Sequence, residues 1–471
     1  MIIKKLNQFP LIRILGRYFS KLIFILGIIS FIIILILSFY YFNSGMYERY
    51  KPLLLLKKIN DKIIYRYFGF DFYKIDKYLN RNIKSLKYFV IDNDLENITI
   101  KIDRENLNNL ERQRKNKLNR TSEITSDFSK ATLNYDENNY KIKMRVKGDR
   151  VLHWYNKDET SYKIDLRGKD RIWGLEEFSI QKPITRNYIY EYIFHKFLEF
   201  NNLISLKYFF VNLDINNKKH GIYAVEEGFS KELIERNKKK NGPIFGLDED
   251  EGVIYPNIKY DLYSKKFWAN NYPELTKKAS LKLKKLKLGK INTNEIFDIE
   301  KWATYFAIID LTGNFHGSIP KSVKLYYNPD SQKFEPIGFD GHYNSDLFQN
   351  FLTIDFLDED NKNCDYICIE REWYLKFLRL EDRNVNKKFI NLYLDELKKI
   401  SSDKFINDFQ RKNLEQINFF NDQFLSESSK KDKVLYKGFG LYLFDNKYLL
   451  KRSKYLQKRI SEIEIKFSKN I

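Results

Sequence analysis

The sequence contains only two cysteines among its 471 residues, Cys364 and Cys368. This scarcity excludes a scaffold held together by several disulfides and a zinc site with four cysteine ligands. The two cysteines are four residues apart and would share one side of a helix, where two free thiols are favoured over a disulfide. The sequence also lacks a Walker loop, a Cys/His metal cluster, an exposed Ser elbow, internal repeats and low-complexity tracts.

The composition is that of a folded but strongly basic protein. Aromatic residues make up 16% and hydrophobic residues 43% of the chain, which excludes disorder over its whole length. Lys and Arg total 83 against 62 Asp and Glu, which gives a net charge of +21. Such an excess can indicate nucleic acid, anionic lipid or phosphorylated ligands. The basic residues are dispersed, however, and the abundance of Lys, Asn, Ile, Tyr and Phe is typical of an AT-rich genome. We therefore expect no nucleic-acid partner.

Residues 22–42 are an apolar stretch without a charge and are long enough to cross a hydrocarbon core of ~30 Å as a helix. Five basic residues and no acidic residue precede it: Lys4, Lys5, Arg13, Arg17 and Lys21. The positive-inside rule then places residues 1–21 in the cytoplasm and the main domain outside. The alternative is a cleavable signal peptide, but its apolar core usually has only ~7–15 residues. We predict an uncleaved, single-pass anchor in the cell membrane.

After the anchor, the hydrophobic pattern predicts an α+β protein. Residues 43–130 are expected to be a juxtamembrane or linker region with some strand and helix, in which 104–120 form an exposed charged helix or linker. Alternating residues at 140–147 and 161–167 predict strands, and the spacing at 186–200 predicts a buried helix. Two hairpins are expected, one over 206–225 and one over 323–339. From Glu370 the sequence predicts mostly helix.

Five short motifs occur in a specific order along this region. They are Lys147-Gly148-Asp149, Thr160-Ser161-Tyr162-Lys163, Arg186, the strand Gly221 to Glu227, and the strand end Phe339-Asp340-Gly341-His342. In this order they resemble the spore-coat-protein-H (CotH) kinase family, which has an atypical protein-kinase-like fold. The resemblance covers about residues 140–345. We assign residues 131–345 to a CotH kinase-like core and 346–471 to a mainly helical C-terminal lobe.

The resemblance implies a site for ATP and Mg²⁺. Lys163 would hold the nucleotide phosphates, and Glu226 would orient Lys163. Arg186 and Gly148 would also contact the nucleotide, Gly148 through its backbone. Asp340 would bind the metal, as a carboxylate at the end of a strand suits a hard cation. Without the resemblance, Lys163 and Glu226 would be ion-pairing surface residues and Arg186 a helix-terminal residue.

The sequence departs from the family pattern where a catalytic carboxylate is expected. Asn314 is kept, but the acid position falls on residues 315–317, and Lys321 or Ser322 replaces a metal-binding Asn. The second Asp of the strand-end motif is His342. Because imidazole ionises near neutral pH, His316 is predicted to act as the base. The alternatives are a structural role for the histidine and an inactive site.

Three functions follow from these observations. The first is Mg²⁺-dependent phosphoryl transfer from ATP to an extracytoplasmic envelope protein or glycan, which the retention of Lys163, Glu226 and Asp340 favours. The second is a catalytically inactive binding or assembly module, which the scarcity of nucleotide outside a bacterial membrane favours. The third, a membrane-anchored module that binds anionic polymers, is disfavoured because the basic residues are dispersed.

Overall fold

The computed structural model describes residues 94–119, 127–148, 150–154, 156–247, 260–341, 350–358, 370–380, 382–430 and 446–468. All of them belong to one compact unit, Lys87–Ile471. Residues 22–42, for which a membrane anchor was predicted, and both cysteines lie outside this set. Among the described residues, no helix is both long and apolar enough to span a bilayer.

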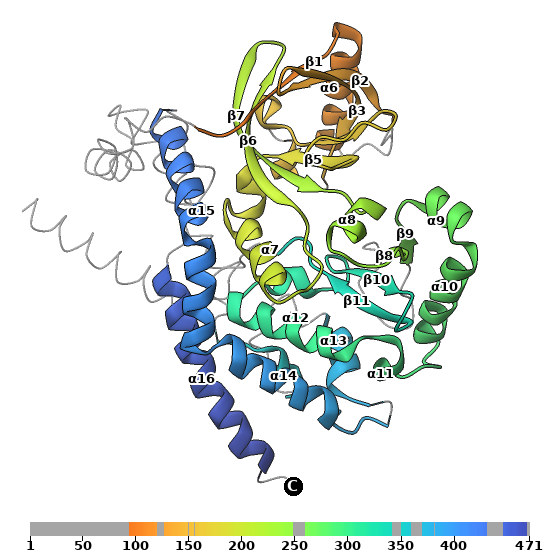
Figure 1. Cartoon of the computed structure of the whole chain (residues 1–471), viewed down its shortest axis with the longest axis vertical. Coiled ribbons are helices and arrows are strands. Elements are labelled where there is room, and N and C mark those ends of the chain that lie inside the picture. Colours follow the sequence, from red (N-terminus) through yellow and green to blue (C-terminus); the bar gives the residue numbers. More distant parts are fainter. Residues whose placement is uncertain are drawn as a thin grey trace, which may run out of the picture. The chain divides into compact units, whose positions relative to one another are not determined.

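The first half of this unit is a closed barrel of seven strands (Figure 1). The strands follow one another around the barrel in the order β1-β2-β3-β4-β5-β7-β6. Their bounds are β1 (Asn97–Lys101), β2 (Ser129–Tyr135), β3 (Asn138–Val146), β4 (Tyr162–Leu166), β5 (Glu177–Gln181), β6 (Tyr208–Ile215) and β7 (Lys218–Glu227). The parallel pairing of β1 with β6 closes the barrel, and the other neighbours are antiparallel.

The barrel forms because its strands alternate apolar and polar side chains, which point to opposite faces. In β3, Ile142, Met144 and Val146 are buried in the interior, and the residues between them are basic. Helix α6 (Arg104–Asn119) packs against β2 and β3 and adds Leu110 to this core. The charged stretch predicted as a helix or linker is therefore a helix that covers the barrel.

Two helices pack against the outer face of β6 and β7. Helix α7 (Tyr190–Phe200) contacts β6, and α15 (Asp403–Lys430) contacts both α7 and β7. The ring of Phe210 on β6 lies 6.4 Å from Tyr192 of α7 and 4.8 Å from Phe424 of α15, measured between centroids. Aromatic packing thus joins the barrel to the rest of the unit.

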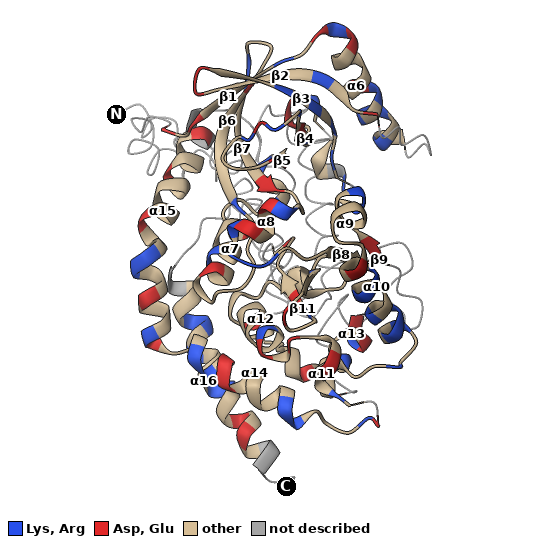
Figure 2. Ribbon diagram, turned by 45° about the vertical axis from the view of Figure 1, so that its right-hand side comes forward, with Lys and Arg blue, Asp and Glu red and all other residues tan. Residues whose placement is uncertain are grey.

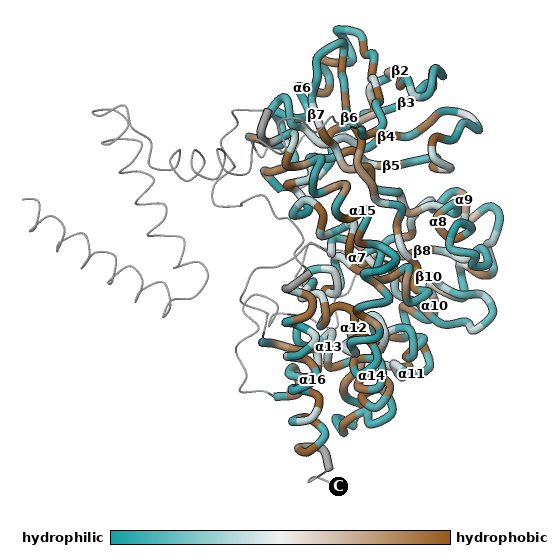
Figure 3. Tube along the Cα trace, turned by 60° about the vertical axis from the view of Figure 1, so that its left-hand side comes forward, coloured by the Kyte–Doolittle hydropathy of each residue, from teal (hydrophilic) through white to brown (hydrophobic). Residues whose placement is uncertain are grey.

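The second half contains a four-stranded sheet of order β11-β10-β8-β9. Its strands are β8 (Ile244–Leu247), β9 (Tyr260–Leu262), β10 (Lys324–Asn328) and β11 (Lys333–Ile337). The accompanying helices are α8 (Lys231–Arg236), α9 (Lys265–Asn271), α10 (Pro273–Lys287), α11 (Thr293–Ile296), α12 (Ile299–Thr312), α13 (Arg371–Leu378), α14 (Lys387–Ile400) and α16 (Asn446–Ser468). Helix α12 is apolar around most of its circumference and contacts β11, α14 and α16, so it forms the centre of this half (Figure 3).

The structure confirms the predicted α+β class, both hairpins and the helical C-terminal region. The buried helix expected over 186–200 begins later, because a short 3₁₀ helix, η4 (Pro183–Arg186), and a left-handed Asn187 precede it. The closed barrel was not predicted. Its closure depends on the parallel pairing of β1 with β6, which no local pattern reveals.

Asp310 is a fully buried carboxylate at the centre of the helical half. Its Oδ1 accepts a hydrogen bond of 2.9 Å from the Thr353 backbone N–H, and its Oδ2 accepts one from the Tyr393 hydroxyl. The Arg452 Nε donates to the Asp310 carbonyl oxygen at 2.8 Å. Burial raises the pKa of Asp310 to about 7, although these partners oppose the shift.

We expect Asp310→Asn to remove part of the pH dependence of stability. Between about pH 4 and pH 7 the folded protein keeps a proton on Asp310 that the unfolded chain releases. The contribution of this group to the free energy of unfolding is therefore complete below about pH 4 and is lost as the pH rises through about 7. The difference between Asp310→Asn and wild type should change by on the order of 1 kcal/mol or more across this range in urea unfolding. A constant difference would contradict the raised pKa.

Candidate active site

The candidate site lies where the barrel meets the second half of the unit. Five short segments contribute to it: the end of β3, η4, the end of β7, the 3₁₀ helix η5 (Phe315–Ser318) and the chain after β11. The side chains that meet there are Lys147, Arg186, Glu226, His316 and Asp340. They are far apart in the sequence, and only the packing of the two halves brings them together.

Glu226 is the anion on the barrel side of the site. It lies on β7, where only 2% of its surface is exposed, and its Oε1 forms an ion pair with Lys147. Its Oε2 accepts a 2.9 Å hydrogen bond from Gln181 and lies 3.7 Å from the Arg186 Nε. Burial works to raise the pKa of Glu226, but the charges of Lys147 and Arg186 outweigh burial and lower it. Glu226 is therefore an ionised carboxylate.

Arg186 connects this anion to the second one. Its Nη1 lies 2.8 Å from Asp340 Oδ1, and only 6% of its side chain is exposed. Burial disfavours the charged form of Arg186, but Asp340 and Glu226 outweigh burial and raise its pKa. Arg186 thus stays a guanidinium cation that bridges the barrel and the segment after β11.

Asp340 follows β11 with a left-handed backbone, φ 59°. This conformation is uncommon for a residue with a side chain and is frequent at functional positions. The next residue, Gly341, has no room for a side chain, because a Cβ there would lie 2.1 Å from the Phe194 ring. The tight turn directs the Asp340 carboxylate at both Arg186 and His316.

His316 is held against Asp340 by the short helix η5. Its Nδ1 lies 3.1 Å from the Asp340 carbonyl oxygen and 3.2 Å from Oδ2, and its Nε2 contacts the Arg150 guanidinium. Since a guanidinium only donates hydrogen bonds, Nε2 must be the acceptor and Nδ1 must carry the proton. In this arrangement the Nε2 lone pair of His316 is occupied by Arg150.

Two side-chain hydrogen bonds hold the backbone of η5. The Tyr305 hydroxyl donates to the Gly317 carbonyl at 2.6 Å, and the Trp373 Nε1 donates to the Ser318 carbonyl at 3.0 Å. A Cβ on Gly317 would lie 3.0 Å from the Gly341 Cα, so two glycines allow the two segments to approach. The side chain of His316 consequently faces the site, although only 4% of it is exposed.

Three cationic side chains lie near the ring of Phe339, the residue before Asp340. The Lys324 Nζ lies 5.3 Å, the Arg186 Cζ 5.4 Å and the Lys147 Nζ 5.9 Å from its centroid. Arg150, in contact with His316, is a fourth basic side chain at the site. The buried carboxylate of Glu191 also acts on Arg186, in addition to Glu226 and Asp340, so basic side chains outnumber carboxylates by one. Such an excess around an aromatic ring stabilises a bound anion.

Lys163 lies elsewhere, contrary to the expected pairing with Glu226. It is on β4, directly opposite Ser179 of β5, which in turn is opposite Glu226. Two strand spacings, together ~10 Å, therefore separate Lys163 from Glu226. The Lys163 Nζ lies 2.7 Å from the Glu177 carboxylate and 3.9 Å from Asp165. Lys147 takes the place beside Glu226 that the sequence analysis gave to Lys163.

Gly148 forms the turn that follows β3. Its φ is 92°, and a Cβ there would lie 2.3 Å from the His153 ring. Its carbonyl oxygen accepts hydrogen bonds from Lys117 at 2.8 Å and from Trp154 at 3.3 Å. A backbone contact between Gly148 and a nucleotide stays a prediction. Asp149 and His342 lie outside the described residues.

Sequence reasoning missed Lys147, Arg150, Gln181 and Lys324. Lys147 stood in a quoted motif, but the motif was given a backbone role. The alternating pattern of β3 offers one sequence signal for the Lys147 side chain, because the lysine continues the polar face of that strand. In the structure the Lys147 N–H donates to the Ser161 carbonyl, which keeps the residue next to β4. Arg150 and Lys324 carry no local signal that distinguishes them from the many other basic residues.

The site can hold a metal only together with an anionic ligand. Mg²⁺ is usually bound by one or two carboxylates, with phosphate oxygens and water completing its shell. Asp340 supplies one carboxylate, and the described part of the chain contains no group of three or more His, Cys, Asp and Glu suited to a metal. The donors thus fit a cation that arrives with a nucleotide.

Comparison with known proteins supports the resemblance seen in the sequence. The family described as CotH kinase protein matches residues 129–436, which include every residue of the site described above. A search of curated proteins found no match. Because the match extends over well over half of the chain, the protein belongs to the CotH kinase family.

Proposed function

We propose that this protein transfers a phosphoryl group from ATP, with Mg²⁺, to a hydroxyl group of an extracytoplasmic protein or glycan. The observation that carries the proposal is that Lys147, Arg186, Asp340 and His316 lie in one cluster with excess positive charge, in which Lys147 and Arg186 share Glu226 and Asp340 contacts both Arg186 and His316. Phosphoryl transfer depends mainly on positioning and on neutralising negative charge. Membership in a kinase family supports nucleotide use in general.

Each residue has a distinct role in this proposal. Lys147 and Arg186 would bind phosphate oxygens, and Glu226 would keep both cations in position. Asp340 would hold the metal, which supplies further charge neutralisation when it is bound. For Asp340 to bind the metal, Arg186 has to give up its ion pair with Asp340 and pair with a phosphate oxygen instead. In this structure the Arg150 guanidinium occupies His316 Nε2, so Arg150 would first have to leave it. His316 would then take the proton of the acceptor hydroxyl at Nε2 as the bond to the γ-phosphorus forms and the bond to ADP breaks.

A second candidate function is a binding or assembly module without catalytic activity. It is favoured by the Arg186–Asp340 ion pair of 2.8 Å, which occupies the metal-binding carboxylate. It is also favoured by His316, which stands where the family has a carboxylate. The two candidates differ in one observable, since only the first predicts transfer of the γ-phosphoryl group.

We expect ATP to stabilise the full chain, purified in mild detergent, and Mg²⁺ to increase this effect. A ligand at one hundred times its Kd stabilises the folded state by about 2.7 kcal/mol, which a thermal-shift assay detects. Asp340→Asn should abolish the contribution of Mg²⁺, because it removes the carboxylate. Lys163→Met should leave both shifts unchanged, because Lys163 pairs with Glu177 outside the site. A shift that depends on Lys163 but not on Asp340 would contradict the assignment.

We expect His316→Ala to lower the rate of phosphoryl transfer at least about a hundredfold, which is the usual contribution of a general base. Casein, which is rich in Ser and Thr, serves as the acceptor, and radiolabelled ATP reports the transfer. The nucleotide-dependent thermal shift should be retained. His220→Ala is the matched control, since His220 lies on β7 and contacts the Asp158 carbonyl instead. Equal rates for His316→Ala and wild type would exclude His316 as the base, and absence of transfer by wild type would favour the binding module.

A further inference from the structure

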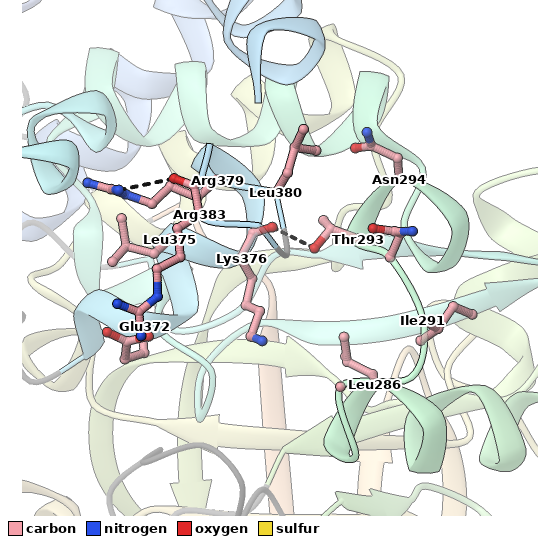
Figure 4. Close-up of a pocket in the computed structure, with 12 residues that line it drawn as sticks. Leu286, Ile291, Thr293, Asn294, Glu372, Leu375, Lys376, Arg379, Leu380 and Arg383 are labelled. Atoms are coloured by element: carbon pink, nitrogen blue, oxygen red, sulfur yellow. Dashed lines mark hydrogen bonds between the residues drawn. The ribbon is translucent and has the colours of Figure 1, made fainter. Parts of the chain in front are cut away.

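A second feature lies in the helical half, formed by residues other than those of the candidate site. It is a pocket of about 330 Å³ bounded by the end of α10, by α11 and by α13 with the turn that follows it (Figure 4). Besides the neutral polar residues 292–294, its lining has an apolar part and a cationic part. The apolar part consists of Leu286, Ile291, Leu375 and Leu380, and the cationic part consists of Lys376, Arg379 and Arg383. Glu372 is the one carboxylate in the lining.

The walls of this pocket are tied together by hydrogen bonds. The Thr293 hydroxyl donates to the Lys376 carbonyl at 2.5 Å, which joins α11 to α13. The Arg379 Nη1 donates to the Arg383 carbonyl at 3.1 Å, which closes the turn after α13. Figure 4 shows both bonds. The pocket is thus pre-formed, and a ligand would not have to order its walls.

Positive charge continues beyond the pocket along α10. This helix carries six lysines and a single carboxylate, Glu274, and Figure 2 shows its basic residues close to α11. Lys278 and Lys282 are four residues apart, a spacing at which like charges repel. Burial and the charges of Lys278 and Lys333 lower the pKa of Lys282. The Lys282 Nζ donates to the Gln332 carbonyl at 2.6 Å, so the other lysines of α10 are the ones that add to the positive charge near the pocket.

One apolar side chain of the pocket wall remains exposed. Leu380 is 40% exposed and lines the pocket, and Leu288, which precedes the lining residue Gly289 in the sequence, is 53% exposed. An exposed leucine in the wall of a pocket that is also lined by apolar residues suits a partner with apolar side chains. A phosphodiester or polyphosphate chain would satisfy the cations but would leave these leucines in water.

We propose that this pocket docks an acidic polypeptide segment that carries large apolar side chains among its carboxylates. The carboxylates would pair with Arg379 and Arg383 and with the lysines of α10. The apolar side chains would cover Leu286, Leu375 and Leu380. This inference concerns binding alone and does not rest on phosphoryl transfer at the candidate active site.

The test measures fluorescence anisotropy of a labelled twelve-residue peptide of Asp, Glu and Leu with the full chain in detergent. A peptide with Ser in place of Leu and inorganic polyphosphate are the comparison ligands. Wild type should bind the leucine peptide saturably and at least tenfold more tightly than the serine peptide. Arg379→Glu combined with Arg383→Glu should weaken binding at least tenfold.

The matched control makes the same charge change on the barrel, with Lys101→Glu and Lys141→Glu, and should alter binding less than threefold. Leu380→Ser changes one exposed side chain and should weaken the leucine peptide severalfold, so it tests the pocket even if the double arginine variant does not fold. Circular dichroism checks the fold of each variant. Equal losses in the two charge variants, equal binding of both peptides, no effect of Leu380→Ser, or tighter, arginine-dependent binding of polyphosphate would each overturn the proposal.

Discussion

The position of Arg186 between Glu226 and Asp340 is the interaction on which the candidate site depends. Glu226 belongs to the barrel, and Asp340 follows the last strand of the second sheet. A buried guanidinium needs anionic partners to compensate its charge, so removal of Glu226 or Asp340 would weaken that compensation in a site shielded from water. This requirement fixes the relative placement of β7 and the segment after β11.

The same interaction explains why the site is suited to an anion. The two carboxylates hold Arg186 and Lys147 in place, but they do not neutralise all of the surrounding cations, which include Arg150 and Lys324. The remaining positive charge is shielded from water by Phe339 and by the adjoining segments. A charge in such a place interacts more strongly with a ligand than it would on an exposed surface. Arrangement of charge before the substrate binds is the main contribution of a protein to phosphoryl transfer.

The sequence predicted those parts of the structure that local patterns encode. The hairpin of β6 and β7 was evident because two β-rich runs flank Asn216-Asn217, and both asparagines adopt the left-handed conformation that such a turn requires. The barrel was not evident, because its closure pairs β1 with β6 more than a hundred residues away.

The candidate site was likewise predictable only where local sequence patterns determine it. Glu226, Arg186, His316 and Asp340 were singled out in the sequence, and the structure brings all four together. The cation beside Glu226 was assigned incorrectly, because Lys147 and Lys163 both lie near strand ends, and only strand register separates them. Lys163 is opposite Ser179, two strands from Glu226, whereas Lys147 extends from the end of β3 to reach Glu226. Register is a tertiary property that a single sequence does not reveal.

We expect Lys147 to face the nucleotide phosphates. Labelling with an ATP analogue that carries a reactive acyl phosphate tests it most directly, because such a group acylates the lysine nearest the phosphates. Burial lowers the pKa of Lys147, which favours the nucleophilic amine. Mass spectrometry of the labelled full chain should find the modification on Lys147, and excess ATP with Mg²⁺ should prevent it. ATP-sensitive modification of Lys163 instead, or no ATP-sensitive modification of any lysine, would contradict the account.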